Sequence, residues 1–159
     1  MEGKFYPNNP KEWDYQVIEE LIKTQYEEDA FIEYKRSLNP PNGKDKSEWN
    51  TDIERELVAF ANGRGGFLIF GIAEENNQFE PHGISEQENM DVRVKQMVSG
   101  ANPSLNMETS NPINKPDSSN VFFVVKVNEA TKKPVSTSDS SYYIRINSSK
   151  SPMNRENLK

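Results

Sequence analysis

The chain has 159 residues, the length of about one domain, and carries 19 Lys and Arg against 25 Asp and Glu, a net charge of -6. It contains no cysteine and one histidine, which excludes a disulfide framework, a thiolate zinc site and a cysteine nucleophile and argues against a multi-histidine metal site. The longest apolar run, 67–73, is far too short to span a bilayer, and the N-terminus lacks a secretory pattern. We therefore expect a soluble, cytoplasmic protein, and the acidic balance argues against a general nucleic-acid coat.

A helix and a strand are expected in the first part of the chain. Residues 1–10 hold two Pro and two Asn and predict an irregular lead-in. Apolar residues at i, i+4 spacing predict a helix over 12–25. Residues 30–36 alternate in polarity and predict a strand in which Glu33 and Lys35 share one face.

A second helix is expected after a polar loop. Prolines and a glycine make 37–48 a loop, and an apolar stripe predicts a helix over 50–62. Glu54 and Glu56 are two residues apart on this helix, so they do not face each other and we expect both to be solvated. The glycines of 62–66 (NGRGG) end the helix, and at least one of them should have a positive φ.

The later elements are mostly strands. Residues 67–72 and 121–127 are nearly continuous apolar runs, which is typical of strands buried on both faces. Residues 141–146 alternate and predict a further strand. An S-x-x-E capping box that starts at Ser85 predicts a helix to about residue 99. Residues 103–118 are rich in Pro, Asn and Ser.

The order α-β-α-β-α-β-β predicts a single compact α+β, or mixed α/β, domain with a central sheet flanked by helices. Acidic residues exceed basic ones in 1–34, and basic residues exceed acidic ones in 126–159. We expect a helical lead-in over 1–25 and a tail over 154–159.

Glu28, Glu33 and Lys35 form the first candidate site. Carboxylates hold Mg²⁺, and a lysine beside them neutralises charge that develops on a phosphate, so the triplet suits metal-assisted phosphodiester cleavage. The alternative is an exposed strand face with a surface ion pair, the usual meaning of an E-x-K triplet.

Basic residues supply the second candidate site. Lys132 and Lys133 precede a strand in which Tyr143 and Arg145 share a face, and aromatic and basic groups together suit single-stranded nucleic acid. The alternative is a half-buried strand with an amphipathic rim. Arg64 in the glycine segment could contact phosphate, although the order helix-loop-strand and the missing Lys-Ser/Thr exclude a Walker loop.

Five segments together resemble the Schlafen-type AlbA-like domain, over about residues 26–153. They are EEDAFIEYKRSL, LVAFANGRGGFLIFGIAEENN, HGIS, VFFVVKVNEATKKPV and SYYIRINSSKSP. The family pattern reads E-x4-E-[FY]-K, A-F-A-N-x-x-G-G, a K-P segment and Y-x-R. The resemblance implies a compact α/β domain that is usually described as a DNA-binding module of transcriptional regulators.

The resemblance also implies an enzymatic alternative. Vertebrate Schlafen proteins cleave structured RNA such as tRNA with three acidic residues and a divalent metal. Two of these acids would fall on Glu28 and Glu33, which would then be the metal ligands, with Lys35 alongside as a further catalytic residue. The third falls on Ala73, and Glu74 lies one residue late, so the resemblance puts a Mg²⁺- or Mn²⁺-dependent nuclease second.

We therefore expect a non-enzymatic domain that binds nucleic acid, DNA or structured RNA, and that acts in regulation. The alternatives are the metal-dependent nuclease and an ATP-binding or protein-interaction module. A homodimer is also considered, because the related enzymes pair two lobes and this chain holds one. The expected nucleic-acid contacts are Lys35, Arg36, Arg64, Lys132, Lys133, Tyr143 and Arg145.

Overall fold

The two apolar runs of the sequence lie side by side in the computed structural model, which describes residues 5–153. Strand β2 (Gly66–Phe70) is buried throughout and pairs antiparallel with β8 (Asn120–Val127). On its other side β2 pairs parallel with β1 (Ile32–Lys35). The prediction that 67–72 and 121–127 contribute central strands of one sheet is confirmed, although Ile72 already belongs to the next strand.

Short strands complete the sheet around β8, and two hairpins lie outside it. The short strands β5, β6 and β7 all pair antiparallel with β8, while β3 pairs with β4 and β9 pairs with β10. The remaining elements are η1 (Pro10–Glu12), α1 (Tyr15–Lys23), α2 (Lys46–Asn62), β3 (Ile72–Glu75), β4 (Gln78–Pro81), β5 (Ile84–Ser85), α3 (Met90–Met97), β6 (Met107–Thr109), β7 (Ile113–Asn114), β9 (Tyr143–Ile146) and β10 (Ser149–Pro152).

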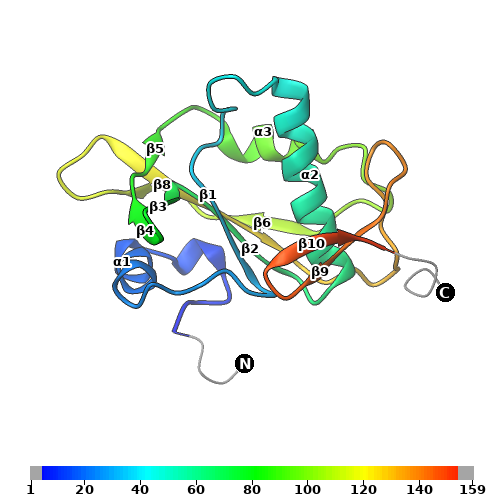
Figure 1. The fold of residues 1–159 in the computed structure, drawn as a ribbon, viewed down its shortest axis with the longest axis horizontal. Helices are drawn as coiled ribbons and strands as arrows, with labels where there is room; N and C mark the ends of the chain where they lie inside the picture. Colours follow the sequence, from blue (N-terminus) through cyan, green and yellow to red (C-terminus); the bar gives the residue numbers. More distant parts are fainter. Residues whose placement is uncertain (1–4, 154–159) are drawn as a thin grey trace.

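Helices cover both faces of the sheet, as Figure 1 shows. Successive residues of a strand point to opposite faces. Leu68 therefore packs with α2 and α3 in one apolar cluster. Phe67 and Ile69 pack with α1 and with Trp13 in the other. The expected α+β domain with a central sheet flanked by helices is confirmed.

The hairpin β9–β10 crosses α2 in front of the sheet (Figure 1) and contacts that helix directly. It covers a side of α2 that would otherwise face solvent. Glu54 and Glu56 lie under this hairpin and the loop before it, and they are 2% and 3% exposed. The expectation that both glutamates are solvated is therefore wrong. Their spacing on the helix did not show that a later segment of the chain, the β9–β10 hairpin with the loop before it, covers this side of α2.

Two helix starts differ from the prediction. Helix α2 begins at Lys46, because the carboxylate of Asp45 accepts hydrogen bonds from the N–H groups of Ser47 and Glu48 and caps the helix. The capping box at Ser85 is wrong: Ser85 lies in β5, and α3 starts at Met90. The segment 103–118, which is rich in Pro, Asn and Ser, contains the short strands β6 and β7.

One glycine of the 62–66 segment has the predicted positive φ. Gly65 has φ +80°, and its N–H donates to the carbonyl of Phe60, which allows α2 to end and β2 to begin within a few residues. A Cβ at Gly65 would lie 2.7 Å from the carbonyl oxygen of Val127. Separately, no helix within residues 5–153 is both long and apolar enough to cross a membrane.

Candidate functional site

Charged side chains from β1 and the segment before it, from α2 and from the β9–β10 hairpin meet where the hairpin covers the helix. The strand β1 supplies its polar face, α2 supplies one side of its middle turns, and the hairpin closes over both (Figure 1). We call this set the buried charged cluster. Its members are Glu28, Glu33, Lys35, Asp52, Glu56, Arg145 and Lys150.

Arg145 is the centre of the buried charged cluster. Its side chain is 1% exposed, and Nη1 lies 2.5 Å from Glu33 Oε1 and 3.3 Å from Glu56 Oε2. Nε and Nη2 donate to the carbonyl of Asp29, and Nη2 also donates to that of Ile32. Arg145 was a predicted nucleic-acid contact, but its side chain is buried here because the hairpin turns it towards α2 and β1.

Two lysines complete the cluster through one aspartate. Lys150 Nζ lies 2.6 Å from Glu56 Oε1 and 2.9 Å from Asp52 Oδ1. Lys35 Nζ lies 2.9 Å from Asp52 Oδ2. The sequence interpretation included Lys35 but missed Asp52, Glu56 and Lys150. The i, i+4 spacing of Asp52 and Glu56 on one helix face was a usable signal.

The cluster changes the pKa values of its acids in opposite directions. Burial raises the pKa of Glu33 to about 7, and the neighbouring Glu28 carboxylate adds to this rise. Burial also raises the pKa of Glu56, and the charge of Glu33 acts in the same direction. For Asp52, burial would raise the pKa, but the ion pairs with Lys150 and Lys35 outweigh it and lower the pKa to about 2.

Glu28 and Arg145 close the outer edge of β1. Glu28 Oε2 accepts a hydrogen bond from the N–H of Tyr34 at 2.8 Å, and Arg145 donates to the carbonyl of Ile32 at 2.9 Å. An edge strand otherwise presents unpaired backbone groups to other chains. Glu28, a candidate catalytic residue, and Arg145, a candidate nucleic-acid contact, therefore both form hydrogen bonds with the backbone of this strand.

The structure brings Glu28 and Glu33 together, as the nuclease hypothesis requires, and of the two later acids only Glu74 lies near them. Glu74 is exposed and lines a hollow of about 270 Å³ with Glu28, whereas Glu75 contacts Arg36 and His82. Within residues 5–153 no group of three or more His, Cys, Asp or Glu side chains is arranged to hold a metal ion. Because Arg145 already neutralises Glu33, the described residues do not form a ready-made metal site.

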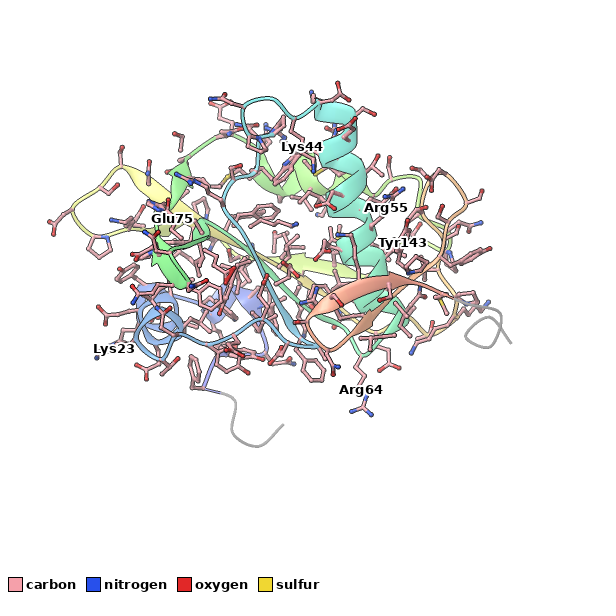
Figure 2. All side chains as sticks on the ribbon, viewed as in Figure 1. Lys23, Lys44, Arg55, Arg64, Glu75 and Tyr143 are labelled. Carbon is pink, nitrogen blue, oxygen red and sulfur yellow. The ribbon has the colours of Figure 1, made fainter. Side chains whose placement is uncertain are left out.

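Three of the predicted nucleic-acid contacts gather at the C-terminal end of α2. Lys133 Nζ donates to the carbonyl of Gly63 at 2.8 Å and pairs with Glu129 at 2.7 Å. The hydrogen bond from Lys133 lowers the pKa of Glu129, and the charge of Arg64 acts in the same direction. Arg64, Lys132 and Lys133 are exposed, and Figure 2 shows Arg64 extending away from the fold. We call these three side chains the basic patch.

The other predicted contacts lie outside the basic patch. Lys35 is half-buried in the charged cluster, and exposed Arg36 pairs with Glu75 at 3.4 Å. Tyr143 is half-buried, with the guanidinium of Arg55 5.0 Å from its ring centre (Figure 2). Tyr143 therefore already has a cation against its ring.

The comparisons with known proteins agree with this architecture. The fold is similar to the crystal structure of the DIP2311 protein from Corynebacterium diphtheriae, with a TM-score of 0.58 and 16% sequence identity. That match covers 87% of this chain and 29% of the other, so the chain spans less than a third of that protein's length. A comparison with curated proteins finds no match. The family model described as Schlafen, AlbA_2 matches residues 28–154, and the chain therefore belongs to this family.

Proposed function

We propose that the chain is a nucleic-acid-binding domain that holds phosphates at the basic patch. The observation that carries the proposal is the gathering of three exposed cations on a chain whose net charge is -6. Arg64 and Lys132 form no hydrogen bond or ion pair with any other residue in 5–153, so their charge is available to a ligand. Family membership points to the same class of partner.

The C-terminal end of α2 stabilises the cations of this patch. The last turn of a helix carries a partial negative charge on its free carbonyls, which attracts cations. Lys133 is fixed there by the carbonyl of Gly63 and by Glu129. Lys132 precedes this anchored lysine in the chain and Arg64 follows Gly63, and both are exposed. Lysine and arginine are the usual phosphate contacts in nucleic-acid interfaces.

The test is direct binding of labelled duplex DNA, single-stranded DNA and tRNA, with the Lys132→Glu/Lys133→Glu double variant as the comparison. Each phosphate that the protein neutralises contributes about −0.7 to −0.9 to the slope of log affinity against log salt, so three contacts predict a slope of about −2 to −3. The double variant should bind all three probes more weakly with unchanged thermal unfolding. Unchanged affinity in the double variant, or no binding by the wild type at low salt, contradicts the proposal.

Within this proposal we take DNA as the first partner and structured RNA as the second, and we place the chain in a regulator of transcription that acts in the cytoplasm. A homodimer would double the basic surface. The probe panel separates DNA from RNA, and light scattering with and without the preferred probe measures the oligomeric state.

A nuclease is the second candidate function, and one observation favours it. Glu33 has a pKa of about 7 beside a second carboxylate, Glu28, and acids poised near neutral pH are common among catalytic bases. A Mg²⁺ or Mn²⁺ cofactor belongs to this candidate alone. Cleavage of tRNA with and without these ions tests it: cleavage that disappears in Glu33→Gln supports an enzyme, and intact tRNA in every condition removes this candidate.

A further inference from the structure

A polar groove lies at the opposite end of α2 from the basic patch. Figure 2 shows Lys44 near one end of this helix and Arg64 beyond the other. A hollow of about 760 Å³ opens between the chain before α2 and helix α3. A second hollow of about 460 Å³ shares Lys46, Asn50 and Met97 with it, and the larger hollow is called the groove below.

Amide side chains line the larger hollow, and the fold does not use them. They are Asn39, Asn50, Asn89 and Gln96. None of these four side chains forms a hydrogen bond with another residue in 5–153, and Asn50 Oδ1 is buried without a partner. Buried polar atoms in native proteins nearly always have a partner, so an unsatisfied one requires an explanation. A ligand in the groove that forms a hydrogen bond with the Asn50 amide would explain why the fold leaves this group without a partner.

Asn89 gives independent support. It has φ +58°, a left-handed conformation that is uncommon in residues other than glycine. It precedes α3, yet its side chain makes no capping hydrogen bond. Asparagine adopts this conformation more readily than other residues with a side chain, so the informative feature is that the Asn89 side chain lines the groove without capping the helix.

The rest of the lining matches the parts of a nucleotide. Lys46 on α2 and Arg93 on α3 bring cations to the two walls, and cations bind phosphate. Amides and the carboxylate of Glu88 are groups that read the edges of bases. Val92, which is 46% exposed, offers an apolar surface to the face of a base.

We propose that this groove binds an unpaired nucleotide of a single-stranded RNA or DNA segment. In a duplex the base faces are stacked and the pairing edges are occupied, whereas an unpaired nucleotide brings both into the hollow. The volume lies within the roughly 300–1,000 Å³ that ligand pockets span. The inference rests on the proposed nucleic-acid binding and adds the class of substrate, a strand with at least one unpaired base.

The experiment compares a 12-nucleotide single-stranded RNA, its DNA equivalent and a fully paired RNA hairpin. Three variants of the full chain are measured against the wild type: the groove variant Asn39→Ala/Asn89→Gly/Gln96→Ala, the patch variant Lys132→Glu/Lys133→Glu, and the control Asn76→Gly. Glycine suits the backbone at both 89 and 76, because Asn76 also has a positive φ, is exposed and lies outside the groove.

The groove variant should bind single strands about tenfold more weakly and bind the hairpin as the wild type does, because each lost hydrogen bond costs about twofold to tenfold in affinity. The patch variant should lose affinity for every probe, and Asn76→Gly for none. The RNA and DNA arms show which sugar the groove accepts.

Wild-type affinity of the groove variant for single strands overturns the groove while leaving the patch standing. Absence of all oligonucleotide binding by the wild type removes both proposals. A neutral extended octapeptide that shifts the NMR side-chain amide signals of Asn50 and Gln96, when single strands do not, assigns the groove to a peptide and also overturns the inference.

Discussion

Arg145 and Arg64 both belong to segments whose sequence suggests phosphate contact, yet the fold gives them opposite environments. Arg145 is buried and engaged by two carboxylates and two backbone carbonyls. Arg64 is exposed and forms no ion pair within residues 5–153. One arginine is engaged by groups within the fold, and the other keeps its guanidinium exposed.

The contrast follows from what each environment requires. A buried cation must be paired, because moving it out of water is costly, and removing one partner then leaves an uncompensated charge. An exposed cation is solvated and contributes little to stability. Stability measurements should therefore respond to the buried charged cluster, and binding measurements should respond to the basic patch.

The largest expected effect is the loss of Arg145. Arg145→Met removes the charge but keeps an apolar stem, and it leaves Glu33 and Glu56 buried without their shared partner. We expect a loss of about 3–5 kcal/mol in the free energy of unfolding. Urea unfolding followed by tryptophan fluorescence measures it, and a loss under 1 kcal/mol would show that the cluster does not stabilise the fold.

The second prediction concerns pH. The pKa of Glu33 is raised from 4.5 to about 7 on folding, so the folded state binds more protons than the unfolded state between these values. Stability should therefore be highest near pH 4.5 and fall as the pH rises towards 7, by at most about 3 kcal/mol. Glu33→Gln removes this contribution, so its stability should fall less steeply than that of the wild type.

Two features sharpen that measurement. Glu56 also has a raised pKa and is present in both proteins, so only the difference between the two curves reports on Glu33. The lowered pKa of Asp52, about 2, makes stability fall on acidification from its ordinary value near 3.8, below the window used. Exposed Glu74→Gln should follow the wild type, and parallel curves for the wild type and Glu33→Gln would contradict the assignment.

The third prediction concerns Lys150, which joins the hairpin to α2. Lys150→Met removes ion pairs to Asp52 and Glu56 at a site that keeps partial contact with water. We expect a loss of about 1–3 kcal/mol, less than for Arg145. Hydrogen exchange should become faster in β9 and β10 before it changes in β2. Equal acceleration in both regions would mean that the hairpin does not open separately.

Much of the fold could be predicted because its signals are local. The apolar runs at 67–72 and 121–127 suit central strands, because such strands are buried on both faces of the sheet. The glycine turn was predictable from chain geometry, since a helix must give way to a buried strand. The start of α3 was not, because the capping-box pattern competed with the pairing of Ile84 and Ser85 to β8.

The candidate site was predictable only in part. The spacing of Glu28, Glu33 and Lys35 identified the strand, but not what closes over it. The burial of Arg145 and Glu56 depends on a hairpin about 90 residues further along the chain than α2. Alternation in a strand tells which residues share a face, and it cannot tell whether that face meets water or another element.

The smallest effect on stability should come from Arg64. Arg64→Ala removes an exposed side chain without an ion pair partner in the described residues, so the free energy of unfolding should stay within about 0.5 kcal/mol of the wild type. Its effect should appear in binding: one lost phosphate contact makes the negative slope of log affinity against log salt shallower by about 0.7–0.9. Titration of labelled single-stranded DNA at several salt concentrations measures this slope, with Lys23→Ala, an exposed lysine on α1, as the matched control.

If Lys23→Ala makes the slope as much shallower as Arg64→Ala does, binding depends on total charge, and Arg64 does not differ from other surface cations. If Arg64→Ala alone makes it shallower, the arginine in the glycine turn contacts phosphate, while the arginine in the hairpin serves the fold.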